Sequence, residues 1–453
     1  MAPPKSGSSR KLFKGTHSRE GKKSDKKSNA PTPGRNGSDQ PKRQNDSNTE
    51  NQDSGQIEIS ATIPITLQQL LLNVFKAALL PSNLSDSQDP DAGESLNIKS
   101  LIQTIKSHLY NRDFDSAFAD ADEKLLRAYA LRWSAARALG YAGLFRSLLK
   151  ALVEGNASDS GDSSTSHPLH VVCIGGGAGA EIVALAAAWR DLVDEGTVPR
   201  TQPELSDVLE AVSLEDRHDS QGDGSSSDSP SQEQVVLQSG PSPNLLSSLS
   251  ITAVDIADWS TVVKRLSSTI LSASVPGSKS HSAPLFPAYP QPTTTESIFN
   301  VDFKHLDVLS LSDPDLTSLF HTTQSSPNHT KLVTLMFTLN ELFSTSMPKA
   351  TSFLLQTTDL LQPGTILLVV DSPGSYSTLK LGKGAGTQEK QYPMKFLLDH
   401  TLLSVATGKW EKVISQDSRW WRRDAARLWY DVGEGAGLED MRFQIHVYRR
   451  LGR

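Results

Sequence analysis

The chain has 453 residues, of which 37% are apolar and 21% are charged, and a formal net charge of −6. The apolar share is slightly low for a wholly globular chain, so part of the length is not expected to pack into a core. The single cysteine, Cys173, excludes an intramolecular disulfide framework and a zinc site built from several thiolates, which favours a reducing, intracellular compartment. No run approaches the roughly 18 apolar residues of a membrane span, and no apolar leader follows Met1, so we expect neither a membrane protein nor an exported one.

The charge is unevenly distributed along the chain. Residues 1–50 hold 12 Lys and Arg against 5 Asp and Glu, a balance of +7, which leaves −13 on the other 403 residues. A basic segment rich in Ser, Pro and Gly buries too little apolar surface to offset its ordering entropy, so residues 1–56 are predicted to be a disordered basic arm. Such an arm suits electrostatic capture of RNA or a nuclear-import address, and a solvated tail without a partner is the alternative.

Helical spacing of apolar residues follows the arm. Leu67, Leu70, Leu71 and Val74 recur on one face of a predicted helix at Ile63–Leu80. Helical patterning resumes over Ile98–Leu152. Residues 57–153 are therefore predicted to form an N-terminal helical module.

From about residue 168, short apolar runs alternate with helical stretches, which is typical of βαβ units and a mainly parallel sheet. No full crossover separates the last two runs, so those strands can pair antiparallel. We predict an α/β fold over residues 167–453, with a seven-stranded, mostly parallel sheet and an antiparallel member at its edge. The strands are expected at His170–Gly175, Leu249–Asp255, Phe299–Phe303, Lys331–Phe337, Thr365–Asp371, Glu411–Ile414 and Arg442–Arg449.

Three segments rich in Ser, Gly, Pro and Asp interrupt this framework, at Gly155–Ser166, Asp216–Pro243 and Ser272–Thr295. They fall between the predicted elements. Because the entropy of closing a loop grows slowly with its length, long insertions at the surface are tolerated. We predict that all three are disordered surface insertions.

A glycine-rich turn between the first strand and a helix is the sharpest motif. Gly175, Gly176, Gly177 and Gly179 follow the apolar run and precede the helical Ile182–Trp189. Glycine permits positive φ and close approach of a ligand to the backbone, and the helix N-terminus adds N–H donors for a carboxylate or another anionic group. The spacing fits both a dinucleotide fingerprint and the tighter loop of S-adenosylmethionine-dependent methyltransferases.

Two carboxylates follow later strands. Asp255 ends the apolar run Ile251–Val254, where it can accept both ribose hydroxyls of either cofactor. It lies 76 residues after Gly179, and the predicted insertion at Asp216–Pro243 accounts for the excess over a compact unit. Asp307 closes the next unit, where its side chain can bind an adenine amino group.

These features together resemble a known family. The glycine loop, the Leu332–Leu342 strand and turn, the Leu361–Asp371 unit, the tail Met441–Arg450 and the upstream Tyr129–Ser134 look like the fungal 25S ribosomal RNA (uracil-N3)-methyltransferases. The resemblance spans roughly residues 60–450. It implies a class I, Rossmann-like methyltransferase fold, S-adenosylmethionine as the donor, and a uridine of the large-subunit rRNA as the acceptor. Cys173 departs from the general pattern, in which an acidic residue often precedes the first glycine and contacts the methionine amino group.

Methylation at uracil N3 requires the base to leave any pair and to lose its N3 proton. Open α/β sheets place their chemistry at the carboxyl ends of the strands, where Asn340 and Glu341 follow the fourth strand. We predict that Asn340 reads the uracil edge and that Glu341 acts as base or orienter. The alternative for both is helix capping.

A basic and aromatic segment is the predicted RNA contact. Arg419, Trp420, Arg422 and Arg423 combine base stacking with cations for phosphate, and the alternative is that one Trp packs in the core behind a solvated arginine rim. No metal site is predicted. We expect a monomer that acts on large-subunit rRNA or a pre-ribosomal particle, in the nucleus or nucleolus and the cytoplasm. A nucleotide-dependent Rossmann oxidoreductase and a non-catalytic ribosome-assembly factor are the rival functions.

Overall fold

The computed structural model describes residues 62–80, 97–111, 113–160, 167–197, 246–287, 298–320, 330–381 and 388–452. These described residues belong to one compact unit. The basic arm predicted at residues 1–56 and the insertion predicted at Asp216–Pro243 lie outside the described residues.

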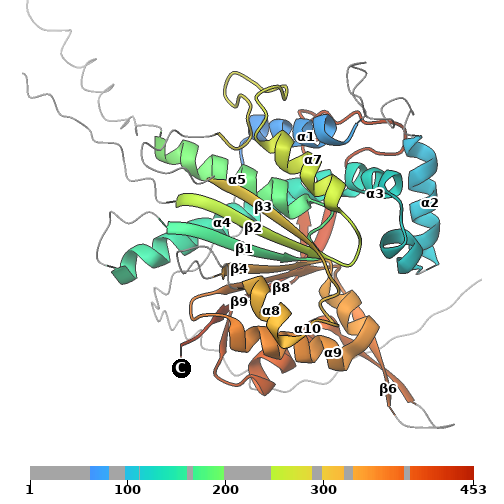
Figure 1. Ribbon diagram of the computed structural model, residues 1–453, viewed down its shortest axis with the longest axis vertical. Coiled ribbons are helices and arrows are strands. Elements are labelled where there is room, and N and C mark those ends of the chain that lie inside the picture. The colour runs from blue at the N-terminus through green and yellow to red at the C-terminus, as the bar shows by residue number, and fades with distance from the viewer. Residues whose placement is uncertain are drawn as a thin grey trace, which may run out of the picture. The chain divides into compact units, whose positions relative to one another are not determined.

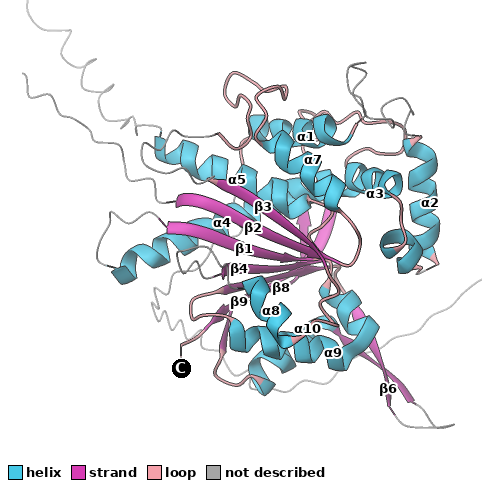
Figure 2. Cartoon of the chain, in the orientation of Figure 1, coloured by secondary structure: helices cyan, strands magenta, loops and turns pink. Residues whose placement is uncertain are grey.

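A seven-stranded sheet forms the centre of this unit, in the order β3-β2-β1-β4-β5-β9-β8 (Figures 1 and 2). The pairs among β1 to β5 are parallel, and β9 runs antiparallel to both β5 and β8. The predicted sheet of seven mostly parallel strands is confirmed, but the antiparallel strand lies one position inside the edge because β8 pairs with its outer side. The strands are β1 (His167–Ile174), β2 (Leu246–Asp255), β3 (Phe299–His305), β4 (Thr330–Met336), β5 (Ile366–Asp371), β8 (Trp410–Trp421) and β9 (Met441–Arg450).

Helices cover both faces of the sheet. One face carries α1 (Ile65–Leu79), α4 (Ala135–Ser160), α5 (Ala180–Thr197) and α7 (Ser260–Ile270), and the other carries α8 (Asp313–Phe320), α9 (Leu339–Leu360) and α10 (Met394–Asp399) (Figure 1). The remaining helical elements are α2 (Ile98–Tyr110) and α3 (Glu123–Tyr129) and the π-helical turns η1 (Asp115–Ala119), η2 (Ala130–Ser134) and η3 (His400–Val405).

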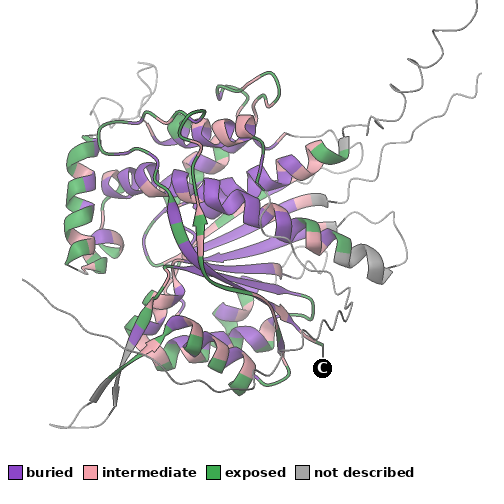
Figure 3. Ribbon diagram, turned by 180° about the vertical axis from the view of Figure 1, so that it is seen from behind, coloured by how far each residue is buried: buried purple, intermediate pink, exposed green. Residues whose placement is uncertain are grey.

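Alternate side chains of the central strands point to opposite faces of the sheet and pack into a separate core on each face. In β1, Val171 and Cys173 belong to the core under α4 and α5, whereas Val172 and Ile174 belong to the core under α8 and α9. Successive side chains of a strand point to opposite faces, so a strand buried on both sides must be apolar throughout. The sheet is accordingly buried along most of its central strands (Figure 3).

The N-terminal helices expected within residues 57–153 pack into the same body as the sheet. Leu71 of α1, Leu131 of η2 and Leu148 of α4 are buried in the same core as Leu185 of α5 and Val263 of α7. The reason is that the apolar faces of α1 and α4 are the cover of one sheet face. Residues of the N-terminal helices can therefore reach the carboxyl ends of the strands.

Two predicted insertions differ in the structure. Residues 272–287 form a loop in which Leu285 and Phe286 are fully buried. The centroid of the Phe286 ring lies 5.5 Å from that of Trp189 and 4.7 Å from that of Phe299. These two apolar anchors outweigh the Ser-rich composition around them. Helix α4 also continues to Ser160, into the segment predicted to be an insertion.

A hairpin that the sequence did not predict pairs β6 (Tyr376–Leu381) with β7 (Gln388–Pro393) and projects from the body near α9 (Figure 1). Within the described ranges, no helix combines the length and apolar character needed to cross a bilayer.

Candidate active site

The glycine loop turns at the carboxyl end of β1. Gly175 and Gly179 have φ of +76° and +81°, and the Gly175 N–H donates to the carbonyl of Val254 at 2.7 Å. A Cβ at Gly175 would collide with the Thr338 side chain, and one at Gly177 with the indole of Trp259. The loop therefore depends on glycine, both for its backbone conformation and for its close contacts with the segments that follow β2 and β4.

Asp255 holds this loop against the end of β2. One carboxylate oxygen, Oδ2, accepts the Gly177 N–H at 3.1 Å, and Oδ1 accepts the Ala257 N–H at 3.1 Å. Desolvation raises the pKa of Asp255, and hydrogen-bond donors on Ala257, Gly177, Trp259 and Ile256 oppose the shift. Each oxygen of a carboxylate has two acceptor sites, so acceptor capacity is left for hydroxyl groups of a ligand.

Asp307 lies two residues beyond the end of β3, close to the same edge. The preceding residue, Leu306, donates its N–H to the Asp255 carbonyl at 2.9 Å. The Asp307 carboxylate caps its own turn, where it accepts the Leu309 N–H at 2.9 Å and the Ser310 hydroxyl at 2.6 Å. The structure thus brings Asp307 toward Asp255 and gives it a local structural role.

Asn340 and Glu341 occupy the first turn of α9, directly after β4. The side chain of Asp371, at the end of β5, accepts the Asn340 N–H at 3.1 Å, while the N-cap residue Thr338 makes no side-chain cap. Asp371 also accepts the Ser372 N–H at 2.7 Å. Asp371 therefore caps the start of α9, and the side chains of Asn340 and Glu341 do not.

Comparison with known proteins adds the family. Residues 78–449, more than half of the chain, match a protein family described as "Putative SAM-dependent methyltransferase". The chain belongs to this methyltransferase family. A relative from Saccharomyces cerevisiae, "25S rRNA (uridine(2843)-N(3))-methyltransferase", is 31% identical over 389 residues, which cover 84% of this chain and 85% of the relative.

Solved structures of methyltransferases are also similar at a low level. A SAM-dependent methyltransferase from Methanosarcina mazei has 11% identity and a TM-score of 0.28, and covers 64% of this chain and 96% of its own. One from Clostridium acetobutylicum has 8% identity and a TM-score of 0.29, and covers 78% and 100%. The class I fold of this methyltransferase follows instead from its own sheet order and from the family.

Acidic residues gather around one cation at the carboxyl ends of the strands. Glu341 is exposed, yet partial desolvation and the Asp371 carboxylate raise its pKa to about 7, and Arg137 opposes the shift. Desolvation raises the pKa of Glu181 to about 8, again against Arg137. The methyltransferase therefore holds carboxyl groups here that can take up or release a proton near neutral pH.

Three residues of this region were not predicted as functional. Arg137 of α4 donates to the Tyr129 hydroxyl at 2.8 Å, and its guanidinium lies 4.9 Å from the ring centroid of Phe337. Phe337 itself has φ of +60°. Glu181 follows the glycine loop directly and is 3% exposed. Only Glu181 gave a signal in the sequence, as an acid within the motif, whereas the other two are brought in by tertiary packing.

The predicted RNA segment lies at the same edge of the sheet. Register pairs Asp371 with Gln444 and Trp421 with Met441, so the end of β8 extends past the carboxyl end of β5. Trp420 is 51% exposed, and the guanidinium groups of Arg422 and Arg442 lie 4.8 and 5.8 Å from its ring.

The other members of that segment are more constrained. Trp421 packs on Gly140 of α4, and the Arg423 N–H donates to Asp440 at 3.2 Å. Arg419 lies in β8, and burial lowers its pKa. One tryptophan thus packs inward, as the alternative allowed, while Trp420 stays available between two arginines.

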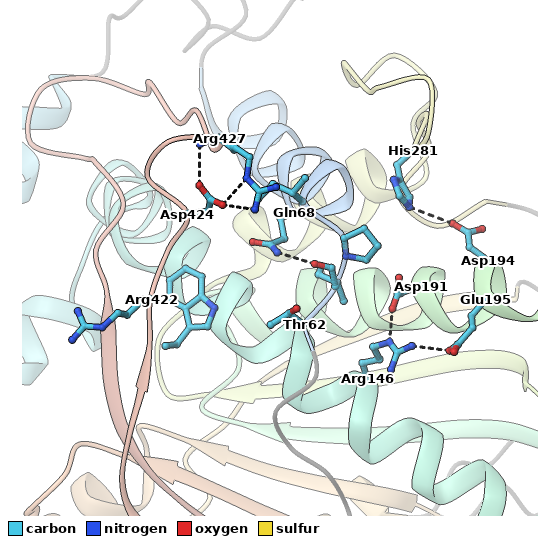
Figure 4. A pocket seen from close by; sticks show the side chains of 14 residues that line it. Thr62, Gln68, Arg146, Asp191, Asp194, Glu195, His281, Arg422, Asp424 and Arg427 are labelled. Carbon is cyan, nitrogen blue, oxygen red and sulfur yellow. Dashed lines mark hydrogen bonds and ion pairs between the residues drawn. The ribbon is translucent and has the colours of Figure 1, made fainter.

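A cavity of about 700 Å³ lies away from the glycine loop, lined by residues of α1, α4 and α5, by His281, and by the end of β8 and the segment that follows it, which includes Arg422 of the predicted RNA segment (Figure 4). Most of its charged side chains pair with one another, whereas Arg422 pairs with Asp440 outside the cavity. Arg146 bonds to Asp191 and Glu195, and Arg427 bonds to Asp424. None of the glycine-loop residues lines it, so we place no step of the reaction there.

Replacing Gly177 with Ala tests the loop. The new Cβ overlaps the indole of Trp259 and approaches the Asp255 side chain, so the loop must shift. We expect the affinity for S-adenosylhomocysteine, measured by calorimetry, to fall at least about tenfold, which corresponds to ~1.4 kcal/mol. Gly196→Ala is the control because nothing lies within 4 Å of its Cβ. Unchanged affinity in Gly177→Ala would refute a ligand-binding role of the loop.

Proposed function

We propose that this methyltransferase transfers a methyl group from S-adenosylmethionine to N3 of a uridine in large-subunit rRNA, either free or in an assembling particle. The similarity to the yeast 25S rRNA (uridine(2843)-N(3))-methyltransferase carries this proposal, because it extends over 84% of the chain. The family gives no support to the rival oxidoreductase. The turnover experiment below distinguishes an enzyme from a non-catalytic assembly factor, because only an enzyme forms methylated nucleosides.

The residues at the carboxyl ends of the strands fit the cofactor. The loop is close-packed where a Cβ would intrude, Asp255 retains acceptor capacity, and Oε1 of Glu181 is buried without a hydrogen bond. We assign the amino-acid end of the cofactor to the loop, the ribose to Asp255 and the adenine amino group to Asp307. The loop residues are Gly175, Gly176, Gly177 and Gly179.

S-adenosylmethionine supplies an electrophilic methyl group on a sulfonium. The protein must then orient the uracil and remove its N3 proton, since N3 is protonated at neutral pH and becomes nucleophilic once the proton leaves. We assign the uracil edge to Asn340, whose amide offers both donors and an acceptor. Glu341 accepts the N3 proton, because its pKa of about 7 lets it be ionised before transfer and protonated after it.

The RNA strand is assigned to the end of β8. The exposed Trp420 stacks on a base, while Arg419, Arg422 and Arg423 attract phosphates. We further propose that the basic arm at residues 1–56 adds electrostatic capture of RNA or nuclear import, and that the protein works as a monomer in the nucleus or nucleolus and the cytoplasm.

Incubating the full-length protein with S-adenosylmethionine and unmodified large-subunit rRNA, free or in pre-ribosomal particles, tests the function. Mass spectrometry of the digested nucleosides is expected to show 3-methyluridine. Binding of S-adenosylhomocysteine without any methylated nucleoside would favour the non-catalytic assembly factor. Methyluridine modified at C5 or O2′ would refute the position.

The Glu341→Gln substitution tests the base. A base works only when ionised, so the wild-type rate should rise with pH through about 7 and level off above it. The variant should lack this rise and turn over about 10²- to 10⁴-fold more slowly, as is typical of a lost general base. Glu411→Gln, at an exposed ion pair with Arg449, is the control. A wild-type rate and pH profile in Glu341→Gln would exclude the assignment.

Trp420→Ala tests the RNA surface. Loss of one base–aromatic stack costs ~1–3 kcal/mol, so the dissociation constant for an rRNA fragment should rise roughly 5- to 150-fold. Trp429→Ala removes another exposed tryptophan, 79% accessible, and should leave binding unchanged. Equal affinities of the Trp420→Ala variant and the wild-type protein in a filter-binding assay would show that RNA passes elsewhere.

A further inference from the structure

Glu181 is a buried acid whose carboxyl group is satisfied only in part by the fold: a hydrogen bond from its own backbone N–H lowers its pKa, but one carboxyl oxygen has no partner. It is the second residue of α5 and is 3% exposed, and its Oε1 has no hydrogen-bond partner. A buried acceptor without a donor costs about 1–3 kcal/mol, so native structures seldom keep one without a use. The Glu181 carboxyl group therefore has an open acceptor beside the glycine loop.

Arg137 is the complementary group. Its guanidinium carries five N–H donors, and within the described chain one of them is engaged, by the Tyr129 hydroxyl at 2.8 Å. None of the ion pairs among the described residues includes Arg137, although its charge acts on the carboxyl groups of Glu181, Glu341 and Asp371. Arg137 thus keeps free donors next to the same loop.

The amino-acid end of S-adenosylmethionine has matching needs. Its α-ammonium group has only donors and requires an acceptor, whereas its α-carboxylate has only acceptors and requires donors. Cys173 offers neither charge, since burial raises the pKa of its thiol and keeps it neutral. Glu181 and Arg137 together present one acceptor group and one donor group to such a zwitterion.

We infer that Glu181 accepts a hydrogen bond from the α-ammonium group of the cofactor and that Arg137 donates to its α-carboxylate. Both residues act as binding residues for the methionine moiety. Arg137 comes from α4, so the N-terminal helices complete the cofactor site of the sheet. This inference rests on the cofactor of the family and is independent of the RNA acceptor proposed above.

Proton release should accompany binding. Four titratable groups surround Glu181: Arg137 on α4 and Asp255 on β2 act on its charge, and its own charge acts on Tyr141 of α4 and Cys173 of β1. Burial raises the pKa of Tyr141 and Cys173, so both are neutral at pH 7. With its pKa of about 8, Glu181 is mostly protonated in the free protein at pH 7, and an ammonium group beside it would favour loss of that proton.

Calorimetry with three ligands and the full-length protein tests the inference. The ligands are S-adenosylhomocysteine, its deaminated analogue and its decarboxylated analogue. Glu181→Gln should weaken S-adenosylhomocysteine roughly 10- to 100-fold and leave the deaminated analogue nearly unchanged. Arg137→Gln should weaken S-adenosylhomocysteine similarly and leave the decarboxylated analogue nearly unchanged. Glu195→Gln, farther along α5, and Arg449→Gln are the matched controls.

Proton release is the second measurement. Titrations at pH 7 in buffers of different ionisation enthalpy should show release on binding of S-adenosylhomocysteine to the wild-type protein and not to Glu181→Gln. The inference is overturned if each variant loses affinity equally for all three ligands, which indicates a structural role, or if neither variant loses any. Failure of the wild-type protein to bind any of the three would overturn the cofactor assignment as well, whereas absence of RNA methylation would leave the inference standing.

Discussion

The hydrogen bond from the Gly177 N–H to the Asp255 carboxylate joins the ends of two neighbouring strands, and the site is built on it. It fixes the loop after β1 against β2, and the bond from the Gly175 N–H to Val254 repeats the connection one step earlier. Both bonds need a backbone without side chains, since the space is filled by Trp259 and Thr338. Because β1 lies between β2 and β4, the same loop also lies beside the turn that presents Asn340.

The N-terminal helices contribute chemistry as well as packing. Their apolar side chains share a core with α5 and α7, and this shared core carries Arg137 to the edge where the carboxylates gather. One cation among several acids keeps their pKa values closer to neutral than desolvation alone would. Loss of these helices would thus remove a charge from the site together with the cover of the sheet.

The central framework was predictable because it depends on local patterns. Continuous apolar runs marked the buried strands, and the glycine loop and Asp255 followed from their places at strand ends. The strands β6 and β7 have six residues each, and β7 is polar apart from Tyr392 and Pro393, so the few apolar residues of β6 gave too weak a pattern to predict a hairpin. The 272–287 loop was misjudged because composition does not show that Phe286 meets Trp189 and Phe299. Arg137 was missed because its partners lie on other elements.

Phe337 combines an unfavourable backbone conformation with a contact to Arg137 at the carboxyl ends of the strands. With φ of +60° it holds a conformation that glycine would adopt without penalty and that costs other residues about 1–3 kcal/mol. Its N–H still bonds to Val370 at 2.6 Å, so the strand ends in register despite the strained backbone. Its ring lies against the Arg137 guanidinium in a cation–π contact. The unfavourable backbone conformation of Phe337 thus places its ring where it preorganises the Arg137 guanidinium for a ligand.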